Sequence, residues 1–252
     1  MKLFFIGAGP GDPELLTLKG KRLLEQADIV IYAGSLIPRD VLKYAKPGVP
    51  TYNSATMTLE DMTAVYQTNL DKPGIMARLH SGDPCLYGSL QEQADWCDKN
   101  GMGYEVVPGV SSFSASAATL KQEFTMPGVT QTVILTRHAN RTPVPERERL
   151  SALSKINASM VIFLSVQDIE DVARELLVGY GPETPVTVVQ RASWKDEKIV
   201  QGSLGDIAGK VMAEKIDRTA LIIVGDALRK QFERSRLYSP DFSHTFRKAK
   251  VQ

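Results

Sequence analysis

Three glycine-bearing loops carry the residues of this chain that are best suited to bind a small molecule. Each follows a short apolar run, and the loops read GAGPGDP from Gly7, SGDP from Ser81 and PGVSS from Pro108. Glycine leaves the backbone bare and permits positive φ, so a flat ligand can approach such a loop closely. In open α/β folds, ligands bind at the carboxyl ends of the strands. Loops of this kind at three strand ends therefore favour a ligand-binding crevice.

Each loop also has a purely structural interpretation. The first is an ordinary strand-to-helix turn, and Asp83 with Pro84 has the form of a helix N-cap followed by the first helical residue, a cap that contributes about 1 kcal/mol. The small residues that follow Ser111 suit close packing of a helix on a sheet. Packing alone explains one such loop better than it explains small residues at all three loops. We therefore favour ligand binding.

The first loop does not fit a dinucleotide-binding fingerprint. Its glycines at 7, 9 and 11 give GxGxG, whereas the fingerprint requires GxGxxG. Pro10 and Pro13 lack the backbone N–H groups that would bind a pyrophosphate. The second strand ends in Tyr32, Ala33 and Gly34, with no carboxylate for a ribose hydroxyl. A nicotinamide-dependent oxidoreductase is therefore a disfavoured alternative.

The sequence shows no arrangement of side chains for nucleophilic or metal-assisted catalysis. His80, His138 and His244 are far apart and form no HExxH motif. Cys85 and Cys97 match neither a CxxC pair nor a zinc-ligand spacing, which suggests reduced thiols. We therefore expect no metal site and assign no catalytic residue. A binding protein without catalytic activity stays open as an alternative.

Composition argues against partners that are recognised by overall charge. The 252 residues include 30 Lys and Arg against 29 Asp and Glu, a formal net charge of +1. We therefore expect neither nucleic acid nor an anionic membrane as a partner. The apolar start before Gly7 is too short for a signal peptide, and no run is long enough to span a membrane. The cytoplasm is the expected location.

Short apolar runs alternate with amphipathic stretches, which predicts an α/β fold. The expected strands are residues 2–6, 29–32, 75–79, 104–107, 132–136, 160–164, 186–190, 199–202 and 220–224. The expected helices are residues 15–24, 89–99, 111–120, 168–177 and 204–215. The order favours a mostly parallel sheet first and then, around RASWKDEKIV, an antiparallel hairpin in a mixed sheet. The expected domains are residues 1–115 and 116–228, followed by a basic, polar tail, residues 229–252.

With their flanking residues, the three loops resemble the signature blocks of the tetrapyrrole methylase family, the class III methyltransferases. The matching segments are GAGPGDPELLTLKG (7–20), HSGDPCLYGS (80–89) and VVPGVSSFSA (106–115). The resemblance extends to about residue 228. It implies two α/β domains with S-adenosylmethionine in the cleft between them, S-adenosylhomocysteine as the product, and a homodimer.

The resemblance also implies a set of positions around S-adenosylmethionine. Carried over one by one, they are Pro10, Ser81, Gly82, Asp83, Leu86, Ser111, Ser112, Leu164 and Ala192, with Ala220 as a weaker addition. Family members often have Gly or Thr where this chain has Ser81 and Ser111, so contacts there are expected through the backbone. Asp83 is the carboxylate best placed for the polar end of the ligand.

Two further segments, TQTVILTRHANRTPVPE (130–146) and ASWKDEKIV (192–200), resemble the branch of the family that methylates C-11 of precorrin-4 or cobalt-precorrin-4 in cobalamin biosynthesis. The precorrin substrate so implied carries carboxylates that need cationic partners, for which Arg137 and Arg141 are the candidates. Both could equally be ordinary solvated arginines. Methylation of another ring carbon, on a related precorrin or a uroporphyrinogen, remains the alternative.

Overall fold

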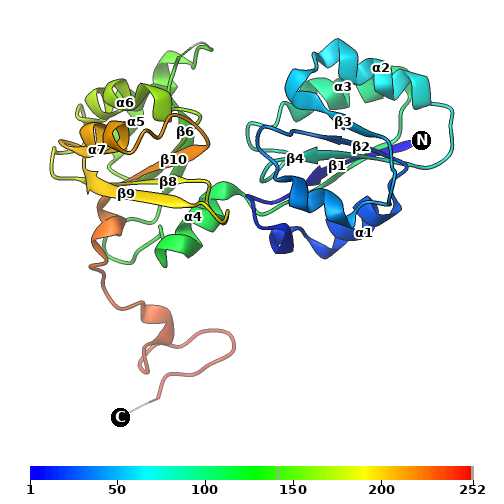
Figure 1. Ribbon diagram of the computed structural model, residues 1–252. Helices are drawn as coiled ribbons and strands as arrows, with labels where there is room; N and C mark the ends of the chain where they lie inside the picture. The colour runs from blue at the N-terminus through cyan, green and yellow to red at the C-terminus, as the bar shows by residue number, and fades with distance from the viewer. Residues whose placement is uncertain (141, 251–252) are drawn as a thin grey trace. The chain divides into compact units, whose positions relative to one another are not determined.

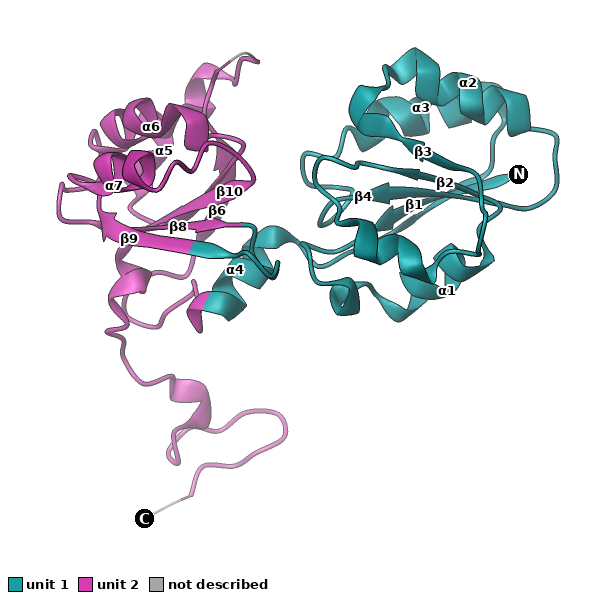
Figure 2. Ribbon diagram, viewed as in Figure 1, with its two compact units in different colours: residues 1–119, 191–198 teal, residues 120–190, 199–252 magenta. Residues whose placement is uncertain are grey.

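The computed structural model describes residues 1–140 and 142–250 and separates the chain into two compact units (Figure 2). They are unit 1, residues 1–119 and 191–198, and unit 2, residues 120–190 and from 199 onward. The expected division after residue 115 would cut a continuous helix, α4 (Ser112–Leu120), and unit 1 instead extends almost to the end of that helix. The sequence also gives no sign that residues 191–198 belong to unit 1.

Unit 1 is built on a five-stranded parallel sheet (Figure 1). In sheet order the strands are β3 (Thr51–Asn53), β2 (Ile29–Tyr32), β4 (Ile75–His80), β1 (Lys2–Gly7) and β5 (Tyr104–Val107). Helix α1 (Leu18–Gln26) covers one face, and helices α2 (Leu59–Asn69) and α3 (Leu90–Asn100) cover the other (Figure 1). This strand order differs from the 3-2-1-4-5 order of dinucleotide-binding folds.

The central strands of unit 1 are buried on both faces, which explains their continuous apolar sequences. Ile6 of β1 packs in a cluster on the α1 side. Its neighbour Phe5 points the other way and packs in a cluster with Tyr66 of α2. The register pairs Gly7 of β1 with His80 of β4, so these two strands end side by side.

Unit 2 contains a mixed five-stranded sheet. In sheet order its strands are β6 (Val133–Arg137), β7 (Ser159–Phe163), β10 (Ala220–Val224), β8 (Pro185–Gln190) and β9 (Lys198–Ser203). β6 is parallel to β7, whereas β10 is antiparallel to both β7 and β8. β8 and β9 are neighbours, and their connection is too short for a parallel crossover, so the expected hairpin is confirmed. The helices of unit 2 are α5 (Leu150–Leu153), α6 (Ile169–Leu176) and α7 (Ile207–Ala213).

Two elements of unit 1, β3 and α2, do not follow from the sequence pattern. All three residues of β3 are exposed, so it shows no apolar alternation. The start of α2 is fixed by a capping box between Thr58 and Asp61 rather than by a strong apolar face. By contrast, the strands expected at residues 29–32 and 104–107 form with those bounds.

The basic tail forms short 3-10 turns in its described part, such as Arg236–Tyr238. The Arg247 guanidinium donates hydrogen bonds to the carbonyl oxygens of Leu237, Ser239 and Phe242, which closes a loop within the tail. Among the described residues, none of the helices combines the length and the apolar character that crossing a bilayer requires.

Candidate functional site

The three glycine-bearing loops meet at the carboxyl ends of the strands of the parallel sheet, because β4, β1 and β5 are neighbours. The Gly82 N–H donates to the Gly9 carbonyl at 2.8 Å, and the Gly9 N–H donates to the Gly82 carbonyl at 3.3 Å. Both glycines have positive φ, +78° at Gly9 and +62° at Gly82, a conformation that residues with side chains rarely adopt. The expected grouping of the loops is therefore confirmed.

Gly7 and Gly109 let the first and third loops touch. A Cβ on Gly7 would lie 2.5 Å from the Cα of Gly109, and a Cβ on Gly109 would lie 2.2 Å from the carbonyl oxygen of Gly82. Packing of loop on loop thus explains these two glycines without a ligand. Gly82 differs, because the atom nearest to its ideal Cβ is the Ser111 Cα at 3.6 Å, an ordinary contact distance, so its positive φ rather than a clash is what favours glycine there.

The Asp83 carboxylate links the second loop to the third. Its Oδ1 accepts the N–H of Cys85 at 2.8 Å, and its Oδ2 accepts the N–H of Gly109 at 3.0 Å. The interpretation of Asp83 as the N-cap of the following helix is wrong, since α3 begins at Leu90 with Ser89 as its N-cap. A turn separates Asp83 from that helix, and the carboxylate stabilises this turn and the neighbouring loop instead.

Five other expected ligand positions lie on the same loops or just after them. Pro10 and Ser111 are buried, whereas Ser81, Leu86 and Ser112 are partly exposed. These residues place apolar and hydroxyl groups next to bare backbone, a mixture that suits a nucleoside-sized ligand.

The connection between β8 and β9, residues 191–197, contacts the first loop. The Trp194 Nε1–H donates to the Pro10 carbonyl at 2.8 Å, and the Ser193 hydroxyl accepts the N–H of Asp12 at 3.0 Å. Ala192 is buried beside them in the chain, so the structure brings this expected position to the first loop. Trp194 was not among the expected site residues, although a large aromatic residue within a polar hairpin connection is a signal that could have pointed to it.

Two expected ligand positions, Leu164 and Ala220, lie in unit 2. Leu164 follows β7 with a φ of +55°, and 62% of it is exposed, which is unusual for an apolar residue in this conformation. Ala220 begins β10 and is part of the main apolar core of unit 2. Its burial gives Ala220 a packing role whether or not it contacts a ligand.

Arg137, an expected substrate-binding residue, stands at the end of β6 and holds the loop that follows. Its Nη1 donates to the carbonyl oxygens of His138 at 3.3 Å and Thr142 at 2.9 Å, and its Nη2 donates to that of Pro143 at 2.7 Å. Arg137 is therefore anchored rather than simply solvated. The other candidate, Arg141, lies outside the described residues.

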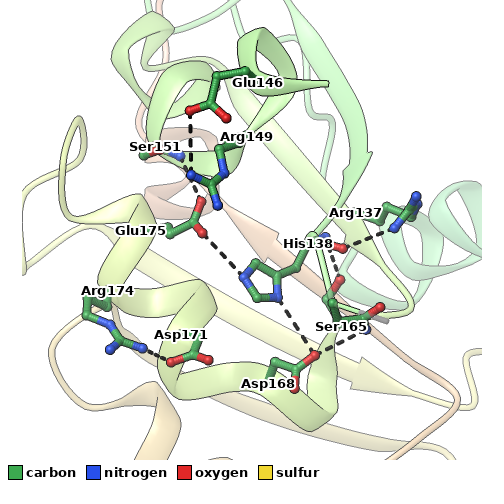
Figure 3. Close-up of polar contacts among 11 residues, drawn as sticks. Arg137, His138, Glu146, Arg149, Ser151, Ser165, Asp168, Asp171, Arg174 and Glu175 are labelled. Atoms are coloured by element: carbon green, nitrogen blue, oxygen red, sulfur yellow. Dashed lines mark hydrogen bonds and ion pairs between the residues drawn. The ribbon is translucent and has the colours of Figure 1, made fainter. Parts of the chain in front are cut away.

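The next residue, His138, is buried between two carboxylates of unit 2 (Figure 3). Its Nδ1 lies 3.7 Å from Oδ2 of Asp168, and its Nε2 lies 3.4 Å from Oε1 of Glu175 on α6. Its backbone N–H donates to the Ser165 hydroxyl at 2.8 Å. These contacts fix the start of the loop after β6, and the Arg137 side chain holds its far end at Thr142 and Pro143. The sequence did not reveal this role of His138.

His80 and the cysteines near the loops have shifted pKa values. Burial, and to a smaller extent the charge of Arg78, lower the pKa of His80 to about 3, so its imidazole is neutral. Burial raises the pKa of the Cys97 thiol to about 11, and burial also raises that of Cys85. In the described part of the chain, no group of three or more His, Cys, Asp or Glu side chains is arranged to hold a metal ion.

Known proteins resemble this chain over nearly its whole length. The family of Tetrapyrrole (Corrin/Porphyrin) Methylases matches residues 2–208. A cobalt-precorrin-4 C(11)-methyltransferase of Methanocaldococcus jannaschii is 50% identical over 250 residues, which cover 98% of this chain and 96% of that protein.

Two solved structures share the fold. The X-ray structure of a cobalamin biosynthetic enzyme, cobalt precorrin-4 methyltransferase, matches with a TM-score of 0.87 at 43% identity, over 90% of this chain and 95% of that one. Uroporphyrin-III C-methyl transferase from Thermus thermophilus, complexed with S-adenosylhomocysteine, matches with a TM-score of 0.77 at 31% identity, over 92% of this chain and 100% of that one. With the family match over most of its length, the chain belongs to the tetrapyrrole (corrin/porphyrin) methylases.

Proposed function

We propose that this protein transfers a methyl group from S-adenosylmethionine to C-11 of precorrin-4 or cobalt-precorrin-4, a step of cobalamin biosynthesis. The observation that carries the proposal is the 50% identity to a cobalt-precorrin-4 C(11)-methyltransferase over nearly all of both chains. The three loops join at the carboxyl ends of the parallel strands, and this junction gives the chain a place to bind the methyl donor.

The residues on these loops fit S-adenosylmethionine. Pro10 and Leu86 offer apolar contact for the adenine, and the buried Ser111 offers its backbone. Gly82 puts no side chain where the second loop contacts Gly9 and Ser111. A carboxylate has about four lone-pair sites, so Asp83 can accept a bond from the ligand's ammonium group besides the two backbone bonds it already makes.

S-adenosylmethionine, when bound, supplies a methyl group on a sulfonium, which is already a good electrophile. The task of the protein is then to hold the donor and the ring carbon in line, which can contribute about 7–11 kcal/mol through effective molarity. The paired backbones of Gly9 and Gly82 and the bond from Gly109 to Asp83 hold the three loops together, which supports this positioning role. We assign no residue to catalysis beyond positioning.

We assign the carboxylates of the tetrapyrrole to Arg137 and Arg141. A guanidinium has five N–H donors, and the hydrogen bonds of Arg137 to the loop use three of them. The two others can bind a carboxylate while the loop bonds hold the guanidinium in place. Arg141 is assigned to the same ligand because it follows Arg137 by four residues in the sequence.

The decisive experiment incubates the purified protein with S-adenosylmethionine and precorrin-4, with and without cobalt, and locates the new methyl group by mass spectrometry and NMR. A methyl group at C-11 of either substrate supports the proposal. A methyl group at another carbon, or transfer to uroporphyrinogen III in place of precorrin-4, would assign the protein another reaction of its family. Donor binding without transfer would show a binding protein.

We also propose that the protein is a cytoplasmic homodimer without a nucleic-acid or membrane partner. Its family resemblance supports the dimer, and the formal net charge of +1 supports the absence of partners that bind by overall charge. Sedimentation equilibrium of the purified protein tests the assembly, and the mass of a single chain would contradict it.

A further inference from the structure

The connection between β8 and β9 holds the first glycine-rich loop at two points, one on each side of Gly11. Before Gly11, the Pro10 carbonyl accepts a hydrogen bond from the Trp194 indole at 2.8 Å. After it, the Asp12 N–H donates to the Ser193 hydroxyl at 3.0 Å. Ser193 and Trp194 therefore hold the residues on either side of Gly11.

The indole of Trp194 also lies directly against Gly11. A Cβ at this position would lie 2.1 Å from Cδ1 and 2.3 Å from Nε1 of the indole. Gly11 does not have positive φ, so its backbone conformation does not demand glycine. Contact with Trp194 is therefore the physical reason for the third glycine of the loop.

The connection between β8 and β9, residues 191–197, has a fixed conformation of its own. Arg191 and Ser193 have φ of +51° and +69°, a conformation that surrounding contacts must maintain in residues with side chains. Oε2 of Glu197 accepts the Ser193 N–H at 2.7 Å and the Thr119 hydroxyl at 3.0 Å. The Arg191 guanidinium lies over the Trp194 ring at 5.3 Å. Ser193 and Trp194 are thus placed in advance for their contacts with the first loop.

We propose that Ser193 and Trp194 are positioning residues for methyl transfer: they fix the first loop, from Pro10 to Asp12, and thereby one wall of the S-adenosylmethionine site. The inference rests on the proposed function, because it assigns that wall to the methyl donor. It predicts that substitution of either residue raises the KM for S-adenosylmethionine and leaves the KM for the tetrapyrrole nearly unchanged.

The first test removes each hydrogen bond separately. Trp194→Phe keeps an aromatic ring without the N–H donor, and Ser193→Ala removes the acceptor. Each is expected to raise the KM for S-adenosylmethionine about 5-fold, the effect of one net hydrogen bond, with the tetrapyrrole KM and kcat changed less than about 2-fold. Trp96→Phe, the same change at the chain's other tryptophan, lies on α3 and is the matched control.

The second test uses steric rescue. Gly11→Ala places a methyl group against the indole and is expected to raise the KM for S-adenosylmethionine more than about 10-fold. Combining it with Trp194→Ala removes the clash, so the double variant should bind the donor better than Gly11→Ala alone. A double variant as poor as the two losses combined would show that Gly11 and Trp194 act independently, which overturns the inference.

Calorimetric titration with S-adenosylhomocysteine separates this inference from the proposed function, since it needs no tetrapyrrole. Thermal unfolding first confirms that each variant is folded. If the wild-type protein does not bind S-adenosylhomocysteine, the proposed function and the inference both fail. If the wild type binds and Trp194→Phe and Ser193→Ala bind equally well, the inference alone fails. Weaker binding by both variants, with Trp96→Phe unchanged, supports it.

Discussion

The Asp83 carboxylate accepts the backbone N–H of Gly109 at 3.0 Å and so ties the loop after β4 to the loop after β5. Its other oxygen accepts the N–H of Cys85 within its own turn. One side chain therefore supports two of the three loops that form the proposed donor site. The same carboxylate is our candidate for the ammonium group of the donor, so loop structure and ligand binding depend on one residue.

Replacing Asp83 by Ala will weaken both stability and donor binding. The N–H groups of Cys85 and Gly109 lose their acceptors, which should lower the free energy of unfolding by about 1–3 kcal/mol. Donor affinity should fall by more than about 10-fold, because the loops loosen and a charge partner is lost. Urea unfolding and calorimetric titration with S-adenosylmethionine measure the two effects.

Asp61→Ala is the matched control for this prediction. Asp61 also accepts a backbone N–H, that of Thr58, but in the capping box at the start of α2. Its loss should lower the free energy of unfolding by about 1 kcal/mol without changing donor affinity. Normal donor binding by Asp83→Ala would leave that carboxylate with a purely structural role.

Gly7→Ala will destabilise the protein strongly. The new methyl group would lie 2.5 Å from backbone atoms of Gly109, so the loops must separate, at a cost of about 3 kcal/mol or more. Gly103→Ala is the control, because no atom lies within 4 Å of its ideal Cβ, and its free energy of unfolding should change by less than about 0.5 kcal/mol. Chemical denaturation of both variants measures the difference, and equal stabilities would refute the close contact of the loops.

Much of the fold follows from the sequence where burial on both faces produces an unbroken apolar run. Ile29–Tyr32 is such a run, and the structure forms it as a strand with the same bounds. The short strand Thr51–Asn53 shows the opposite case, because it lies at the sheet edge with every residue exposed. Its pairing with β2 creates the strand, and that pairing leaves no apolar pattern in the sequence.

The sequence identified the three loops of the candidate site but not the contacts between them. Asp-Pro alone predicts a helix cap at Asp83, yet one of the two partners of its carboxylate is Gly109, 26 residues away. Trp194 lies 184 residues from Pro10, whose carbonyl it binds. Local propensity carries no information about such long-range hydrogen bonds, so only the folded structure reveals them.

Arg137→Ala will weaken tetrapyrrole binding far more than donor binding. The variant loses both a cation for the substrate and the bonds that hold Thr142 and Pro143. We expect the KM for the tetrapyrrole to rise more than about 10-fold, with the donor KM changed less than about 2-fold. Steady-state kinetics with each substrate varied in turn measure this difference.

Two further variants sharpen this prediction. Arg137→Lys keeps the charge, but a single ammonium lacks the planar fork that binds several acceptors at once, so it should restore only part of the affinity. Arg147→Ala removes a cation whose side chain is 88% exposed, and it should leave both KM values unchanged. Equal losses of donor and tetrapyrrole binding in Arg137→Ala would contradict the assignment of Arg137 to the substrate.

His80 makes the stability of unit 1 depend on pH. Its ring is buried at the end of β4, against the ring of Phe5 at 5.8 Å between centroids. Burial, with the nearby charge of Arg78, lowers its pKa from 6.5 to about 3. Between these two values the unfolded chain binds a proton that the folded protein does not, so stability falls as the pH drops through this window.

At pH 5 this single group should lower the free energy of unfolding by about 2 kcal/mol relative to pH 7.5. His80→Phe keeps a ring against Phe5 and cannot bind a proton, so its stability should fall less over the same range. His244→Gln changes an exposed histidine of the tail and should keep the wild-type slope. Urea unfolding at several pH values measures these slopes. An unaltered slope in His80→Phe would mean that the folded protein protonates His80 as readily as the unfolded chain does, which its burial opposes.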